Sequence, residues 1–330
     1  MSETLKNLLK DYDKKRIDAQ MELDDRIKQA YKISPRLEQI DTELHTLGVK
    51  VSLEMLNKKN NDLITDLNEQ VKKLKNEKNK IIKELNLDLT PHYECNLCND
   101  TGYIMNGYES SMCSCLKQKL FNIEFNKSNI YNLQKQNFDS FKSTYYSDSV
   151  NLEKYKVNIS PRENIENIKR IAINFINNFD DPNNKNLLFT GNTGLGKTFL
   201  SNCIANELIK KGKTVLYQTS PIMLDSIIDY RFNKSNMSFN ILENILDVDL
   251  LIIDDLGTEC MNNMKFTELF NILNSRLLNT KKITKTIIST NLSLQNILNN
   301  YDERIVSRII GEYNCCYFFG DDIRILKQSR

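Results

Sequence analysis

The chain has 330 residues, of which 40% are hydrophobic and 27% charged, an ordinary globular composition with room for more than one folded unit. A formal net charge of +2 excludes an overall basic field that would draw the protein onto nucleic acid or an anionic membrane, so any DNA contact must be local. The N-terminus is charged from its third residue and no apolar run reaches the length of a signal peptide or membrane span, so we expect a cytoplasmic protein without a membrane partner.

Residues 1–90 are rich in Lys, Glu, Asn and Leu and predict an α-helical, coiled-coil-like region. Their apolar residues recur three and four apart along a heptad-like seam: Leu37, Ile40, Leu44, Leu47 and Val51, then Ile64, Leu67, Val71, Leu74, Ile81 and Leu85. Ser34 followed by Pro35 is typical of a helix start, and the seam loses phase between Gly48 and Asn60, so we expect two or three helices folded back as a hairpin. A bundle that buries its own stripe and an arm that docks on a partner both fit this pattern.

Residues 91–118 contain four cysteines and predict a small zinc-binding module. Cys95 and Cys98 are two residues apart, Cys113 and Cys115 are one residue apart, and fourteen residues separate the pairs. Four thiolates suffice for tetrahedral Zn²⁺, which would stabilise a segment too short to have much core of its own. The narrow second spacing leaves room for His92 in place of one cysteine, and redox chemistry or an iron–sulfur cluster is an alternative without further sequence support.

Residues 119–160 are rich in Asn, Ser and aromatic residues with weak periodicity, and we interpret them as a linker. From residue 161 onward, short apolar runs alternate with helical stretches: NLLFT, TVLYQTS, DLLIID, TKTIISTN and YNCCYFF. This alternation predicts an α/β domain over residues 161–330, built on a mainly parallel five-stranded sheet.

The first strand of this domain is followed by a GxxxxGK[ST] motif that opens a helical stretch: Gly191, Asn192, Thr193, Gly194, Leu195, Gly196, Lys197 and Thr198. Glycines in such a loop let backbone N–H groups converge on phosphate oxygens, and the following helix N-terminus adds its dipole. Lys197 is expected to neutralise the β- and γ-phosphates, and the Thr198 hydroxyl to bind Mg²⁺. The motif therefore predicts a P-loop for a nucleoside triphosphate.

Two further strands end in polar residues that suit this site. Asp254 and Asp255 follow the run LLII, as in a Walker B element, with Asp254 toward Mg²⁺ and Asp255 polarising the attacking water. Since many ATPases have Glu at the second position, the shorter Asp255 suggests slow hydrolysis. Asn291 ends another strand, where an Asn could orient that water, although Asn at a strand end is more often a turn former.

Arg304 and Arg308 lie four residues apart, on one face of a predicted helix, and surface ion pairing is the simple explanation. The alternative is that the Arg308 guanidinium stabilises the γ-phosphate held by a neighbouring subunit. Arg324, near the last strand, could act similarly within its own subunit.

Together these motifs resemble the ATPase domain of bacterial replicative helicase loaders of the DnaC/DnaI type, in the order GNTGLGKT, LLIIDDLG, STN, ERIVSRI and FFGDDIR. The resemblance spans residues 161–330 and implies an AAA+ domain without a lid, ATP and Mg²⁺ as cofactors, and self-association on the helicase. It also implies that Arg308 is an arginine finger acting in trans, Arg304 its partner at the nucleotide, and Arg324 a second sensor. The replicative helicase hexamer and single-stranded DNA are the implied partners.

The function expected from this resemblance is an ATP-dependent loader that binds the helicase through residues 1–118 and delivers it onto single-stranded DNA when replication begins. Its ATPase activity is expected to be slow and stimulated by a partner or DNA. A transposition helper ATPase, which partners a transposase, and a non-hydrolysing nucleotide-sensing zinc adaptor are the alternatives. The cysteines weigh against the former, and Asp255 permits the latter.

Overall fold

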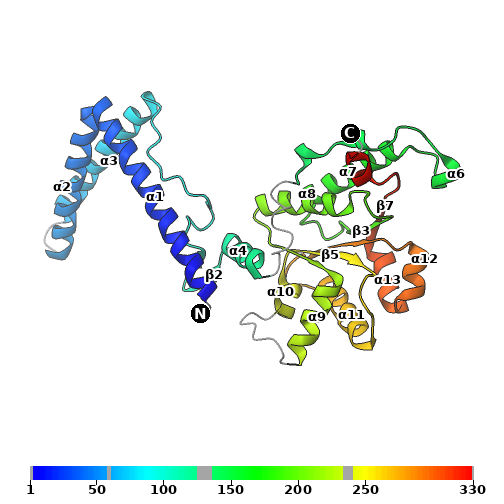
Figure 1. Cartoon of the computed structure of the whole chain (residues 1–330). Coiled ribbons are helices and arrows are strands. Elements are labelled where there is room, and N and C mark those ends of the chain that lie inside the picture. Colours follow the sequence, from blue (N-terminus) through cyan, green and yellow to red (C-terminus); the bar gives the residue numbers. More distant parts are fainter. Residues whose placement is uncertain (1–2, 58–60, 125–135, 233–240, 329–330) are drawn as a thin grey trace. The chain divides into compact units, whose positions relative to one another are not determined.

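A computed structural model describes residues 3–57, 61–124, 136–232 and 241–328 (Figure 1). The chain divides into two compact units, one over residues 3–113 and one over residues 114–330. The division into four segments made from sequence stays a prediction. None of the helices in these described ranges is both long enough and apolar enough to cross a lipid bilayer.

The first unit begins with three helices: α1 (Glu3–Ile33), α2 (Pro35–Asn57) and α3 (Asn61–Glu84). The helical N-terminal region is thereby confirmed, and α2 starts at Pro35 as predicted. Helices α2 and α3 lie side by side as a hairpin, joined by ion pairs from Arg36 Nε to Glu77 Oε1 (2.8 Å) and from Lys78 Nζ to Asp41 Oδ1 (2.5 Å). Leu37 is fully buried, so the apolar seam forms a core at the base of this hairpin.

The cysteine pairs are connected by a β-hairpin that the sequence did not predict. Strands β1 (Tyr103–Asn106) and β2 (Glu109–Met112) pair antiparallel, with Gly107 in the left-handed conformation in the turn between them. The segment before the first cysteines is tied to α1 by Arg26, whose guanidinium donates to the carbonyls of Asp88 (2.9 Å) and Thr90 (2.7 Å).

The second unit contains a five-stranded sheet in which every pair of neighbours is parallel, with the order β4-β5-β6-β3-β7. The strands coincide with the five apolar runs: β3 (Asn186–Thr190), β4 (Val215–Thr219), β5 (Leu250–Leu256), β6 (Lys285–Thr290) and β7 (Tyr313–Tyr317). The predicted α/β fold is therefore confirmed. Because the strands are parallel, the carboxyl ends of β3, β5 and β6, and with them the predicted functional residues, meet at one edge.

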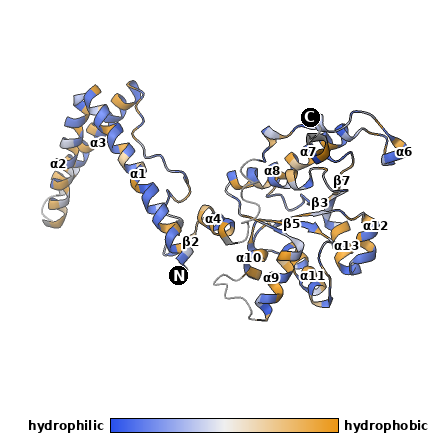
Figure 2. Cartoon of the chain, in the orientation of Figure 1, coloured by the Kyte–Doolittle hydropathy of each residue, from blue (hydrophilic) through white to orange (hydrophobic). Residues whose placement is uncertain are grey.

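Helices cover both faces of the sheet, whose two apolar cores are distinct (Figure 1). Helices α7 (Pro161–Asn177) and α8 (Lys197–Lys210) pack on one face. The other face carries α9 (Ser220–Arg231), α10 (Ile241–Asp247), α11 (Asn263–Leu277), α12 (Leu294–Asn300) and α13 (Glu303–Glu312). The apolar runs of the strands and the apolar stripes of these helices appear as orange segments in Figure 2. The remaining elements are α4 (Ser114–Glu124), the 3₁₀ helices η1 (Phe138–Ser140) and η2 (Ser143–Tyr145), α6 (Leu152–Tyr155) and α14 (Ile323–Gln328).

The outer strand β4 is capped by α4, which runs across the predicted boundary at residue 118. The Gln118 amide accepts from the Val215 N–H (2.6 Å) and donates to the Val215 carbonyl (2.9 Å), as a neighbouring strand would. Phe121 of the same helix is fully buried in the core of the sheet. One residue of this edge strand thus has both backbone groups paired by a side chain.

Candidate nucleotide site and cysteine cluster

The phosphate-binding loop lies between β3 and α8 and depends on glycine at two close approaches. Gly191 and Gly194 both have positive φ angles, of 135° and 74°. A Cβ atom at Gly191 would lie 2.1 Å from the Phe318 carbonyl oxygen, and one at Gly194 would lie 2.0 Å from Oδ1 of Asp322. The backbone carbonyl of Phe318 excludes a Cβ at Gly191, and the positive φ favours glycine at Gly194, which supports the predicted role of this loop in presenting backbone N–H groups to phosphate.

Lys197 is buried at the start of α8, where its ammonium group holds the loop closed. Its Nζ donates to the carbonyls of Gly191 (2.6 Å) and Asn192 (2.7 Å) and to Oδ1 of Asn291 (2.9 Å). Burial lowers the pKa of Lys197 to about 8, although Asp254 and Asp255 oppose this effect. The structure thus brings Asn291 to the P-loop lysine, and the sensor role of Asn291 stays a prediction.

Thr198 and Asp254 meet at the carboxyl end of β5. The Thr198 hydroxyl donates to Oδ2 of Asp254 at 3.1 Å, and the Asp254 carboxylate is almost fully buried. A hydroxyl and a carboxylate oxygen side by side are donors that Mg²⁺ prefers, so these residues fit the predicted ion. Asp254 also accepts from Tyr217 and Ser289, which sequence reasoning missed because both are distant along the chain.

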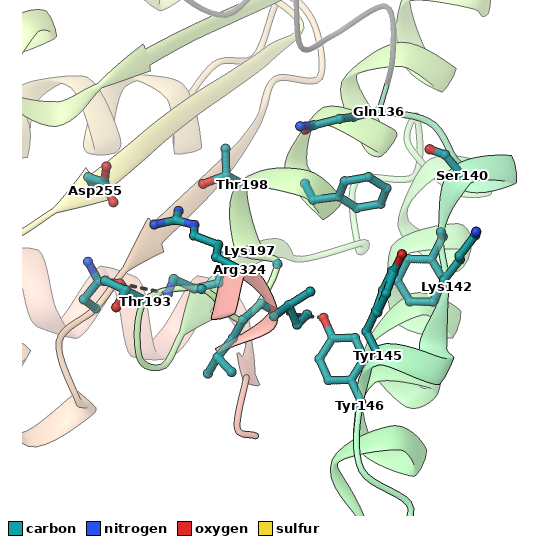
Figure 3. A pocket seen from close by; sticks show the side chains of 17 residues that line it. Gln136, Ser140, Lys142, Tyr145, Tyr146, Thr193, Lys197, Thr198, Asp255 and Arg324 are labelled. Carbon is teal, nitrogen blue, oxygen red and sulfur yellow. Dashed lines mark hydrogen bonds between the residues drawn. The ribbon is translucent and has the colours of Figure 1, made fainter. Parts of the chain in front are cut away.

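The backbone of Asp255 adopts a conformation that few residues other than glycine adopt. Its φ angle of 54° lies in the left-handed region, at an irregularity in the pairing of β5 with β6. Burial, followed by the charge of Asp254, raises the pKa of Asp255, while Lys197 and Arg324 counteract this shift. The Asp255 side chain lines the pocket in Figure 3, and its role as general base stays a prediction.

One wall of this pocket is formed by residues 136–146, hereafter the wall segment, within the stretch predicted as a linker. Asn202 and Asn206 of α8 clamp its first residue, donating to Oε1 and to the carbonyl of Gln136 at 2.7 Å each. At its other end, the buried Tyr146 hydroxyl donates to the Leu195 carbonyl of the P-loop (2.8 Å). Figure 3 shows Tyr145 and Tyr146 lining this side. In the sequence, only the aromatic residues of FDSFKSTYY indicated that this segment could line a pocket.

The segment after β7 also borders this pocket. The Ile323 N–H donates to the Gly194 carbonyl (3.0 Å), and Oδ1 of Asp322 accepts from the Arg324 N–H (2.8 Å). Arg324 lines the pocket beside Lys197 and Thr198 in Figure 3. Its position is compatible with the second-sensor role, which stays a prediction.

Arg304 and Arg308 are not among the described residues that line this pocket. Both guanidinium groups lie over the Phe270 ring, at 5.1 Å and 4.4 Å from its centroid, and Nε of Arg308 donates to Oδ1 of Asn274 (2.8 Å). Arg304 pairs with Asp302. The pair is therefore held on α13 by α11, and its predicted contact with nucleotide would require another chain.

The four cysteines Cys95, Cys98, Cys113 and Cys115 come together, with their sulfur atoms all within 4.8 Å of one another. The Cys95 and Cys113 sulfurs are 3.9 Å apart, close to the roughly 3.8 Å that tetrahedral Zn–S bonds of 2.3 Å require. The cluster could therefore hold zinc. His92 is not a member, since its Nε2 lies 2.5 Å from Asp88 Oδ2 and 3.2 Å from Arg26.

Replacing Cys98 by serine is expected to lower the zinc content from about one ion per chain to near zero, because a buried thiolate is lost from a four-ligand set. Elemental analysis of the purified chain measures this. Cys260→Ser, which alters an exposed cysteine outside the cluster, is the matched control and should leave zinc unchanged. Wild-type protein without zinc would contradict the assignment.

The pKa of Lys197 predicts a pH dependence of nucleotide affinity. Phosphate favours the ammonium form, so the pKa rises on binding, and above pH 8 the free protein must take up a proton to bind. Affinity should be level below about pH 7.5 and about ten-fold weaker at pH 9 than at pH 7, because each pKa unit corresponds to a factor of ten. Calorimetric titration across this range measures the effect. Affinity that stays level or rises with pH would refute it.

The fold and this pocket define the class of protein: an ATP-binding P-loop protein of the AAA+ type. Its residues 136–310 match the family described as "IstB-like ATP binding protein", and since the match covers more than half of the chain, the protein belongs to this family. The matched region includes the wall segment as well as the P-loop.

Curated relatives include the replicative helicase loader DnaC of Escherichia coli (strain K12), 28% identical over 129 residues, which are 39% of this chain and 51% of the relative. DnaC of Buchnera aphidicola subsp. Schizaphis graminum (strain Sg) is 28% identical over 159 residues, or 48% and 61%. The chain thus spans about half the length of these relatives. The crystal structure of DnaI aligns with a TM-score of 0.40 at 25% identity, over 56% of this chain and 95% of that one.

Proposed function

We propose that this protein is an ATP-hydrolysing loader, which binds the replicative DNA helicase hexamer in the cytoplasm and delivers it onto single-stranded DNA. The observation that carries the ATPase part is one pocket lined by Lys197, Thr198, Asp255, Asn291 and Arg324. The loader part rests on the curated relatives named replicative helicase loader, which match 39% and 48% of this chain.

In this proposal, different groups of the chain contribute to different steps of hydrolysis. Lys197 exchanges its loop carbonyls for phosphate oxygens, because an ammonium binds phosphate more strongly than it binds neutral carbonyls. Mg²⁺ supplies charge neutralisation on the phosphates when it is held by Thr198 and Asp254. Asp255 accepts the proton of the attacking water, whose orientation depends on Asn291.

Arg308 supports a switch that depends on self-association. Phe270 and Asn274 hold the guanidinium on α13, and it does not line its own chain's pocket. A second chain on the helicase would bring this cation to the γ-phosphate, where an arginine finger accelerates phosphoryl transfer. Hydrolysis would then be slow in the isolated chain and stimulated in the assembly.

The proposed docking region for the helicase is the first unit. In the C-terminal half of α2, Val49, Leu53, Met55 and Leu56 are all exposed, the last by 80%. Exposed apolar side chains gathered on one helix are typical of a protein-binding face. The cysteine cluster would fix the short segment that follows the hairpin.

Size exclusion with light scattering, applied to the purified chain mixed with its host's replicative helicase with and without ATP, tests the proposal. A stoichiometric complex that responds to ATP is expected, and Leu56→Asp should weaken it while Leu278→Asp, at an exposed apolar residue of the second unit, should not. Failure to bind an active helicase, with zinc content intact, would shift the assignment to a transposase partner or a nucleotide-sensing adaptor.

Asp255→Asn should reduce ATP hydrolysis by about a hundred-fold or more and leave ATP binding intact, because a positioned general base contributes 10²–10⁴. Asn tolerates the left-handed backbone of Asp255, so the free energy of unfolding should change little. Asp255→Glu should instead lower the free energy of unfolding by about 1 kcal/mol, because longer side chains disfavour the left-handed backbone conformation. Steady-state turnover and urea unfolding measure both effects. Full activity in Asp255→Asn would exclude this base.

A further inference from the structure

The Asp254 carboxylate accepts hydrogen bonds from several groups, not only from Thr198, with which it is assigned to Mg²⁺. Oδ1 accepts hydrogen bonds from the Ser289 hydroxyl and from the Asp255 N–H (3.1 Å). Oδ2 accepts from the Thr198 hydroxyl (3.1 Å) and from the Tyr217 hydroxyl. Both oxygens therefore have partners already, and two of these partners are side chains that the predicted site did not include.

These two side chains reach Asp254 from the strands on either side of it. Strand β5 lies between β4, which carries Tyr217, and β6, which carries Ser289. Thr219 is the register partner of Asp254, and Tyr217, two residues earlier, points to the same face of the sheet. Side chains from both neighbouring strands thus bind the Asp254 carboxylate, and strands are more rigid supports than loops.

Burial makes these contacts persistent. Tyr217 is 1% exposed and Ser289 is fully buried, so neither hydroxyl can exchange its partner for bulk water. Thr198 is a further hydrogen-bond partner of the Tyr217 hydroxyl. Tyr217 therefore contacts both residues assigned to the ion.

We propose that Tyr217 and Ser289 are positioning residues for Mg²⁺, which fix the Asp254 carboxylate from both sides so that it stays beside the Thr198 hydroxyl. This inference rests on the proposed Mg²⁺-dependent nucleotide site and deepens it. A carboxylate free to rotate would have to be ordered each time the ion binds, whereas one held by its neighbours is ordered in advance. Groups that orient a metal ligand in this way typically change metal affinity by about 10–100-fold when they are removed.

The simple alternative is that Tyr217 only fills the core between the sheet and α8. The ring packs in that core with Ile252 and Leu250, and it needs no hydroxyl for this role. Tyr217→Phe keeps the ring and removes the hydroxyl, so it separates the two explanations. Ser289→Ala performs the same test on the other oxygen of Asp254.

The chain also offers a matched control. The buried Tyr301 hydroxyl donates to a carboxylate, that of Glu259, and neither residue lines the nucleotide pocket. Tyr301→Phe therefore removes an equivalent hydrogen bond from the same unit without touching Asp254. Any general effect of losing a buried tyrosine hydroxyl should appear equally in this variant.

The experiment measures binding of a fluorescent, non-hydrolysable ATP analogue to the full chain, in EDTA and at increasing Mg²⁺ concentration. Tyr217→Phe and Ser289→Ala are each expected to raise the Mg²⁺ concentration at half-effect by about ten-fold. Affinity in EDTA should stay within about two-fold of wild type, and Tyr301→Phe should match wild type throughout. Thermal unfolding without Mg²⁺ verifies the fold of each variant.

If wild type responds normally to Mg²⁺ while the Mg²⁺ midpoint is unchanged in Tyr217→Phe and Ser289→Ala, that result would overturn this inference and leave the proposed function standing. Nucleotide binding that ignores Mg²⁺ in wild type would overturn the proposed function and this inference with it. If Tyr217→Phe fails to fold, the midpoint of Ser289→Ala decides the outcome.

Discussion

Lys197→Ala is expected to weaken ATP binding by about a hundred-fold or more and to abolish hydrolysis. The ammonium group lies at the centre of the P-loop, within 2.9 Å of Asn291 and closer still to two loop carbonyls. Hydrogen bonds to charged groups contribute about 1.5–3 kcal/mol each, so losing two to phosphate removes roughly 3 kcal/mol or more. That loss corresponds to about two orders of magnitude in affinity.

Equilibrium binding of ATP and steady-state turnover measure the effect of this change. Lys210→Ala is the matched control, since Lys210 ends the same helix, is exposed and pairs with Glu207 on that helix. The control should bind ATP within about two-fold of wild type, because an exposed ion pair contributes little. The zinc content of Lys197→Ala should stay normal. Undiminished ATP binding in Lys197→Ala would remove the P-loop from the proposal.

Arg276→Met is expected to produce the largest loss of stability. The Arg276 guanidinium is 3% exposed and donates to the carbonyls of Ile245 (2.7 Å), Val248 (2.8 Å) and Lys285 (2.7 Å) and to Thr286 Oγ1 (3.1 Å). It thereby ties α11 to the chain entering β5 and to the start of β6. Burial lowers its pKa to about 10, so it remains charged at pH 7.

Methionine keeps much of the volume but leaves these buried acceptors without a donor. Even at about 1 kcal/mol for each of the four acceptors, the free energy of unfolding of the second unit should fall by about 4 kcal/mol or more. Urea unfolding followed by circular dichroism measures this difference. Arg170→Met, which removes an exposed guanidinium bonded to Asn167 on the same helix, should cost less than about 1 kcal/mol. Equal losses in the two variants would contradict the assigned role of Arg276.

The sequence by itself determined those features whose physics is local along the chain. The helix start at Pro35 depends on one proline, and the five strands follow from short apolar runs. The P-loop could be predicted in full because its glycines, Lys197 and Thr198 are consecutive and the following helix supplies the dipole. The cysteine cluster was predictable for the same reason, since four thiolates within one short segment suffice for a metal.

Only the tertiary structure decided which distant residues complete these local motifs. Residues 136–146 have no periodicity that marks them as a pocket wall, and they line the nucleotide site because Asn202, Asn206 and the P-loop backbone bind them. Tyr217 and Ser289 stand 37 and 35 residues from Asp254 and meet it only because the strand order places β4 and β6 on either side of β5. The role of a buried polar side chain depends on the group to which it hydrogen-bonds. Sheet order and strand register, rather than proximity in the sequence, determine which group that is.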